Sequence, residues 1–192
     1  MNVHRRAQAM LADPAAEWAA IAGEPGDPAY VLSRYVTVLA LIPAAFSFIG
    51  ASLIGVVTPN LAILRAPLFN GLFGAIFGYV LSCATVLVLG IVINFSAPLF
   101  GGRRDFDSAF KLAVYSFTPV WLAGIFLVLP GLRFLTLTGF YGAYLMWLGL
   151  PRQTKTPAQH AFVFTALIVL CATALIYGAV VAQRLVFGTA GL

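Results

Sequence analysis

The side chains with which this chain could perform acid–base or metal chemistry are few and far apart. The acidic residues are Asp13, Glu17, Glu24, Asp27, Asp105 and Asp107, and the histidines are His4 and His160. Hydrolysis by a bound metal needs histidines and carboxylates at helical spacing, and no such group occurs here. His160 stands at the start of an apolar segment, at the membrane edge, which argues against a Ser–His pair. We therefore expect no catalytic residue, no metal site, no cofactor and no enzymatic activity.

All six acids lie outside the long apolar segments that dominate the sequence. Ion-coupled carriers usually keep ionisable side chains at membrane depth, because those groups bind the coupling ion. The positions of the acids therefore disfavour a coupled transporter.

The composition is that of a membrane protein. Of 192 residues, 61% are hydrophobic and 9% are charged, and the mean hydropathy is +0.98. An ordinary soluble domain carries about 25% charged residues, so we predict an all-α fold, a polytopic membrane helix bundle. The net charge of +5 does not indicate a nucleic-acid partner, because the basic residues occur singly or in pairs and form no continuous stripe.

The uncharged stretches define the predicted transmembrane helices. A helix needs about 20 apolar residues to cross the hydrocarbon core, and Thr58-Pro59-Asn60 and Pro130-Gly131 are typical of helix ends. We predict a cytoplasmic tail over residues 1–33 and a membrane domain over residues 34–192. The domain should contain five transmembrane helices, at about residues 35–57, 68–95, 112–130, 134–150 and 161–183.

The basic residues set the predicted orientation. With a cytoplasmic N-terminus, eight lysines and arginines face the cytoplasm, and three (Arg65, Arg133 and Arg184) face the exterior, which accounts for all eleven. Cytoplasmic loops carry an excess of lysine and arginine, so we expect the N-terminus in the cytoplasm and the C-terminus outside.

The tail itself contains a helix signal. Asp13 followed by Pro14 is typical of an N-cap and a first helical position, and Trp18 and Ile21 share one helical face. We predict a short amphipathic, interfacial helix anchored at the membrane surface by Trp18. The alternative is an irregular tail that packs loosely under the bundle.

Three glycines form a small-residue stripe in the second predicted span: Gly71, Gly74 and Gly78. Small residues let membrane helices approach closely. The stripe is predicted to pack this span against another span of the chain, and a dimer interface is the alternative.

Polar and aromatic residues gather in the third and fourth predicted spans. The candidate cavity or partner-binding residues are Asn94, Tyr115, Thr118, Pro119, Tyr141 and Tyr144. Pro119 removes a backbone hydrogen bond and should kink the third span. The kinked span and the glycine-rich fourth span would then line a cavity, or else these side chains bond between helices and anchor the interface.

The chain resembles the Yip family, small integral membrane proteins of the Ypt/Rab-interacting type with bacterial relatives. The resemblance is carried by the segments Ala113-Val114-Tyr115-Ser116-Phe117-Thr118-Pro119-Val120-Trp121, Gly139-Phe140-Tyr141-Gly142 and Leu148-Gly149-Leu150-Pro151, and by Lys155-Thr156-Pro157. It implies a role in membrane organisation or trafficking through partner proteins or lipids. The tail is shorter than in eukaryotic members that bind small GTPases, so we expect no small GTPase partner. The resemblance to bacterial members implies a location in the bacterial inner membrane.

We therefore predict a noncatalytic membrane scaffold or adaptor that binds membrane lipids or other membrane proteins, including further copies of itself. The alternative is a transporter or channel that carries a small solute or ion through a cavity near spans three and four.

Overall fold

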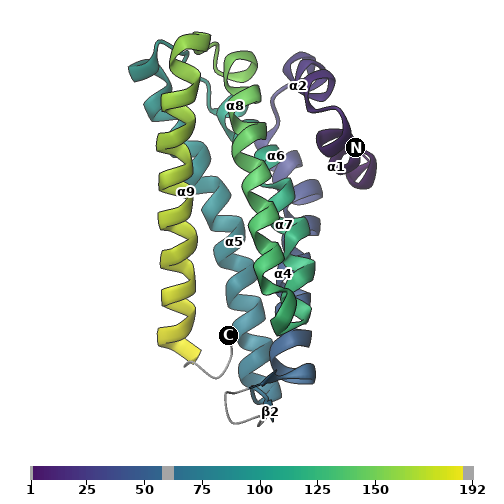
Figure 1. Ribbon diagram of the computed structural model, residues 1–192. Coiled ribbons are helices and arrows are strands. Elements are labelled where there is room, and N and C mark those ends of the chain that lie inside the picture. Colours follow the sequence, from purple (N-terminus) through teal and green to yellow (C-terminus); the bar gives the residue numbers. More distant parts are fainter. Residues whose placement is uncertain (1, 58–62, 188–192) are drawn as a thin grey trace.

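The computed structural model describes residues 2–57 and 63–187, and nearly all of them lie in helices that run along one bundle (Figure 1). The predicted end of the first span at residues 58–60 and the predicted exterior C-terminus lie outside the described residues. The prediction of an all-α membrane bundle is confirmed in its helical character.

The first long helix is assembled from four consecutive segments, α3 (Pro28–Val31), the π-helix η1 (Leu32–Val36), α4 (Thr37–Phe48) and the π-helix η2 (Ile49–Ile54). It begins earlier than the predicted residue 35, because the Asp27 side chain accepts a hydrogen bond from the Tyr30 N–H and caps the helix. A two-residue antiparallel pair, β1 (Val56–Val57) with β2 (Ile63–Leu64), follows at its far end.

The remaining helices run back and forth along the bundle. They are α5 (Leu68–Ser96) with η3 (Ala97–Phe100), α6 (Phe106–Ser116), α7 (Thr118–Ala123), η4 (Gly124–Val128), η5 (Pro130–Phe140), α8 (Tyr141–Gln153) and α9 (Ala158–Phe187). The segments η3, η4 and η5 are 3₁₀ helices. The helix breaks between α6 and α7 at Phe117, as expected from the missing N–H of Pro119.

Within the described residues, four helices are long and apolar enough to cross a membrane: Pro28–Ile54, Leu68–Phe100, Phe106–Val128 and Ala158–Phe187. The predicted fourth span, residues 134–150, is instead divided between the 3₁₀ helix η5 and the α-helix α8. The count of five spans therefore stays a prediction.

The N-terminal tail forms two helices, α1 (Val3–Ala12) and α2 (Pro14–Gly23), which lie at one end of the bundle (Figure 1). Asp13 caps α2 by accepting a hydrogen bond from the Ala16 N–H, and Pro14 occupies its first turn. Trp18 is 0% exposed and belongs to the bundle core. The prediction that Trp18 anchors this helix at a membrane surface is thus wrong, because its ring has a deeper apolar pocket available between α6 and α8.

Helix packing accounts for the three glycines of the second span. A side chain at Gly71 would collide with Ser52 in η2, whereas Gly74 and Gly78 both face Gln183 of α9. The stripe therefore packs α5 against two other helices of the same chain.

Candidate functional site

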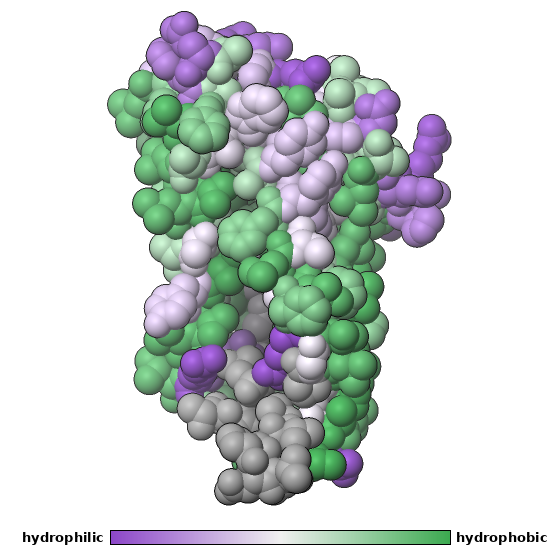
Figure 2. All heavy atoms as spheres, in the orientation of Figure 1, coloured by the Kyte–Doolittle hydropathy of each residue, from purple (hydrophilic) through white to green (hydrophobic). Residues whose placement is uncertain are grey.

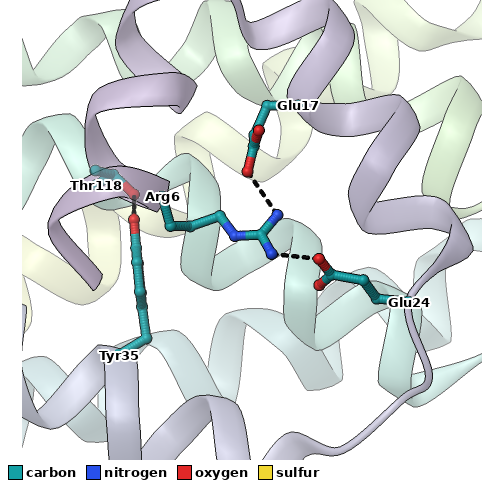
Figure 3. Close-up of polar contacts among 5 residues, drawn as sticks. All are labelled: Arg6, Glu17, Glu24, Tyr35 and Thr118. Carbon is teal, nitrogen blue, oxygen red and sulfur yellow. Dashed lines mark hydrogen bonds and ion pairs between the residues drawn. The ribbon is translucent and has the colours of Figure 1, made fainter. Parts of the chain in front are cut away.

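Two regions of the bundle combine polar groups with close packing or open space. The first, here called the N-terminal cluster, comprises Arg6, Glu17, Glu24 and Lys111 together with the rings of Trp18, Tyr35 and Tyr115. Arg6 bridges the tail helices: one guanidinium nitrogen lies 2.5 Å from Glu17 Oε1, and the other bonds to Glu24 (Figure 3). The cluster ties α1 to α2 and to the segment that follows α2.

The environment of Arg6 keeps it charged. Burial lowers the pKa of the Arg6 guanidinium, but the hydrogen bond to Glu24 and the nearby negative charges outweigh burial and raise this pKa above its ordinary value. The Arg6 guanidinium also lies 5.6 Å from the centre of the Tyr115 ring, within the range of a cation–π contact.

Tyr115 connects the charged groups to the bundle core. Its ring meets the rings of Trp18 and Tyr35 edge-on, with centroids 6.3 Å and 5.0 Å apart. The Tyr35 hydroxyl in turn shares a hydrogen bond of 2.8 Å with Thr118 Oγ1 (Figure 3). Tyr115 and Thr118 therefore fasten the two sides of the α6–α7 break to α1, α2 and η1.

Trp18 and Lys111 attach the tail to the membrane helices. A β-carbon at Gly149 of α8 would lie 2.7 Å from the Trp18 ring and 2.6 Å from Leu112, so only glycine leaves room for this ring. Lys111 is 5% exposed, and its ammonium donates a 2.7 Å hydrogen bond to the Glu24 carbonyl. Both contacts hold the tail against α6 and α8.

The second region is a cavity of about 560 Å³ on the other side of the α6–α7 break, here called the lateral cavity. It is lined by residues of the helices α4, α5, α6, α7, α8 and α9 and of the 3₁₀ helices η4 and η5. Its walls are mostly apolar, and they include Phe117, Val120, Met146, Ile168 and Val180.

The lateral cavity opens toward the side of the bundle. Four of its lining residues are exposed: Leu137 and Phe140 of η5, by 62% and 60%, Ile176 of α9, by 39%, and Thr173 of α9. Figure 2 shows this face hollowed between α9 and the neighbouring helices, with mostly hydrophobic surface above and beside the hollow and hydrophilic side chains at its lower edge. The opening thus lies between apolar helices rather than at a charged end of the bundle.

The polar groups of the lateral cavity are largely satisfied by neighbouring helices. The Trp121 indole N–H donates a 2.9 Å hydrogen bond to Ser82 Oγ, and Gln183 Nε2 donates to the Gly74 carbonyl at 2.8 Å. Ser116 Oγ is buried without a protein partner. Such an interior offers apolar contact and few ligands for an ion.

The structure separates the six residues predicted to form a cavity or partner site. Tyr115, Thr118 and Pro119 are buried, and the first two belong to the N-terminal cluster. Tyr141 and Tyr144 are 36% and 44% exposed, and their rings lie 5.4 Å apart.

The Tyr141 hydroxyl donates a 3.4 Å hydrogen bond to the Leu11 carbonyl of α1. Asn94 is half-buried in α5, with Oδ1 lacking a partner. None of the six is among the residues that line the lateral cavity in the described part of the chain.

The residues that matter most in both regions carried only weak sequence signals. Arg6 resembles a topology signal, and Glu17 and Glu24 resemble the solvated side of an interfacial helix. Gly139 and Gly142, which do line the lateral cavity, were visible as the glycines of the fourth span. Thr136, Gly139 and Gly142 are each three residues apart, which is the spacing of one face of a 3₁₀ helix. This spacing could have indicated a 3₁₀ helix that faces a cavity.

Comparison with known proteins identifies related sequences. Residues 9–180 match the Yip1 domain. The inner membrane protein YohC of Escherichia coli K12 is 30% identical over 138 residues, which cover 70% of this chain and 71% of YohC. YohC of Escherichia coli O6:H1 strain CFT073 matches with the same identity and coverage. No solved structure matches the chain.

Proposed function

Because this chain belongs to the Yip1 domain family, a family of membrane proteins, we propose that it is a noncatalytic membrane adaptor that binds another membrane component in the lateral cavity. The component is a lipid, a transmembrane segment of another protein, or a second copy of the chain. The observation that carries this proposal is the position of the opening, between the apolar helices α9 and η5. A ligand that already resides in the bilayer reaches such an opening without crossing water.

The chemistry of the cavity favours an adaptor over a transporter or channel. Among the described residues, no charged side chain lines the cavity. Its polar groups Ser82 and Gln183 are already bonded to other helices. A path for ions or polar solutes needs polar groups that remain available to the solute, and the lateral cavity offers few.

We also propose five crossings in a bacterial inner membrane, with a cytoplasmic N-terminus and an exterior C-terminus. Helix α8 packs against α2 and α6, whereas η5 packs against η4 and α7. The segment from Pro130 to Gln153 thus returns the chain to the end where the tail lies, which supports a further crossing despite its 3₁₀ half.

Labelling with a membrane-impermeant maleimide tests this topology in a variant whose Cys83 and Cys171 are replaced by serine. A cysteine introduced by Arg5→Cys should be protected in intact cells, and one introduced by Arg65→Cys should be labelled. Labelling of the Arg5→Cys variant alone would show that the orientation is the reverse of the proposed one. Equal labelling of both variants would contradict the proposal that residues 5 and 65 lie on opposite sides of the membrane.

Photo-crosslinking in the native membrane tests the adaptor function. A photoreactive phenylalanine analogue replaces Ile176, which lines the cavity, or Tyr177, which is 70% exposed on the same helix. We expect a discrete adduct of constant mass from position 176 and only diffuse lipid adducts from position 177. Identical adducts at both positions would contradict a binding cavity.

Solute flux distinguishes the alternative function. Vesicles that contain the purified protein should release entrapped ions and small solutes at the rate of empty vesicles. Release that depends on the protein and stops when Ala143 is replaced by phenylalanine would favour a channel through the same cavity.

A further inference from the structure

One helical turn beyond the lateral cavity lies Arg133, a cation with no acidic partner among the described residues. We propose that the lateral cavity binds one anionic phospholipid, with an acyl chain between α5, α7 and α9 and the phosphate at the guanidinium of Arg133. This inference rests on the proposed function and specifies the ligand of the same site.

The geometry of η5 places Arg133 one helical turn beyond the residues that line the cavity. In a 3₁₀ helix, residues three apart lie on the same face, and each residue rises about 2 Å. Thr136 and Gly139 line the cavity, so Arg133 stands on the same face one turn earlier. Its backbone is therefore about 6 Å from that of Thr136 along the helix axis.

The charge of Arg133 is not neutralised within the described residues. The ion pairs of the described chain both involve Arg6, and Arg133 Nε is buried without a hydrogen-bond partner. All six acids of the sequence belong to the tail or to the segment that begins α6, at the other end of the bundle (Figure 1). Arg184, which follows the cavity residue Gln183, adds a second positive charge at the Arg133 end.

Arg133 also lies at the depth of a lipid headgroup. It follows the apolar helix Phe106–Val128 by a few residues, where a span reaches the membrane interface. A guanidinium binds phosphate oxygens through two parallel hydrogen bonds, which makes arginine well suited to this ligand. The apolar walls beyond Thr136 then receive the chain that is attached to the phosphate.

Fluorescence of Trp121 provides a direct test, because this residue lines the cavity and is only 1% exposed. Trp147 is 45% exposed and Trp18 is buried in the N-terminal cluster, so a Trp147→Phe variant leaves Trp121 as the reporter of the cavity. The protein is reconstituted in phosphatidylcholine bilayers that contain a minor fraction of lipid with brominated acyl chains, either phosphatidylglycerol or phosphatidylcholine.

We expect half-maximal quenching at a roughly tenfold lower fraction of brominated phosphatidylglycerol than of brominated phosphatidylcholine, given the strength of charge-assisted hydrogen bonds. Arg133→Gln should remove this preference, and Arg133→Lys should retain part of it. Arg65→Gln is the matched control, since Arg65 lies by the β1–β2 pair and bonds to the Ile54 carbonyl, and it should keep the full preference. Ala143→Phe should abolish quenching by both lipids.

The outcomes separate the two proposals. Equal quenching by both brominated lipids, lost only in Ala143→Phe, would overturn the anionic ligand and leave a lipid-binding cavity intact. A preference that persists in Arg133→Gln would overturn the assignment of the phosphate site. Absence of quenching would overturn a lipid ligand altogether, and the adducts formed at position 176 would then decide whether the cavity binds a protein.

Discussion

The N-terminal cluster and the lateral cavity lie on opposite sides of the same helix break, and they differ in packing: the cluster is filled by side chains, whereas the cavity is not. In the cluster, the tail helices bring charges and large rings together, and the Trp18 ring is fully buried. In the cavity, apolar helices stay apart and leave about 560 Å³ unfilled. The break at Phe117 serves both regions. On one side, the Tyr115 ring contacts Arg6 and Trp18 of the tail, and Thr118 bonds to Tyr35 of η1. On the other side, Ser116 and Val120 face the cavity.

This contrast indicates which region holds the chain together and which is available to a ligand. Half-buried ion pairs and buried rings that fill their space stabilise one arrangement. Unfilled apolar space forgoes contacts that a ligand supplies. The two regions should therefore respond differently to substitution, with stability lost at the cluster and ligand binding lost at the cavity.

The largest expected effect is the loss of the tail's main apolar contact. Trp18→Ala removes a fully buried ring and should destabilise the docked tail by about 3–5 kcal/mol, because Gly149 and Leu112 cannot collapse around alanine. Amide hydrogen exchange over residues 3–23 measures this undocking. Trp147→Ala, at a position 45% exposed, is the control and should leave exchange in the tail unchanged. Equal effects would show that Trp18 does not hold the tail.

The next effect is electrostatic. Arg6→Gln leaves Glu17 and Glu24 without their partner and should cost about 1.5–3 kcal/mol, the range for hydrogen bonds to charged groups. The thermal unfolding temperature in detergent and tail exchange both report it. Arg5→Gln makes the same change at an exposed neighbour and should be nearly neutral. If the two variants have the same unfolding temperature and the same exchange in the tail, the ion pairs of Arg6 contribute nothing to stability.

A smaller loss of stability is expected when Ser82, whose hydroxyl accepts a hydrogen bond at the cavity wall, is replaced. Ser82→Ala leaves the buried Trp121 N–H without its acceptor, which should cost about 1–3 kcal/mol. Ser33→Ala, which removes an exposed hydroxyl bonded to the Tyr30 carbonyl, is the control. Unfolding temperatures that do not differ between the two would show that Trp121 finds another acceptor.

The smallest effect on stability should come from filling the cavity. Ala143→Leu adds atoms to open space, so the free energy of unfolding should change by about 1 kcal/mol or less, whereas the adduct at position 176 should be lost. Gly142→Leu, one residue away, should be much more damaging, because a β-carbon there lies 2.5 Å from the Ser116 carbonyl. A large loss of stability in Ala143→Leu would mean that the space is not available to a ligand.

The helices of the membrane domain could be located from the sequence because each apolar run ends at a charged residue or a proline. Their starts were placed too late where an acid caps the helix. Asp27 moves the first helix to Pro28, and Asp105 moves the third to Phe106, since it accepts a hydrogen bond from the Asp107 N–H. The family resemblance was confirmed by the Yip1 domain match.

The two regions were harder to predict because they depend on contacts between distant segments. Trp18 on an amphipathic helix fits both a membrane anchor and a docked ring, and only the space at Gly149 distinguishes them. A cavity beside the third and fourth spans was predicted, but that segment carries polar residues on both faces. The partner of Thr118, which is Tyr35, could not be identified from local spacing.

The docking of the tail on α6 and α8 also fixes an order of events during synthesis. The tail is synthesised before the membrane helices, yet Lys111, which bonds to the Glu24 carbonyl, lies 87 positions later in the chain than Glu24. At about 5–20 residues per second, that interval lasts roughly 4–17 s. Gly149, which completes the space for Trp18, comes later still. A docked tail is therefore a sign that α6 and α8 have already been inserted, so residues made before the membrane helices reach their final places after them.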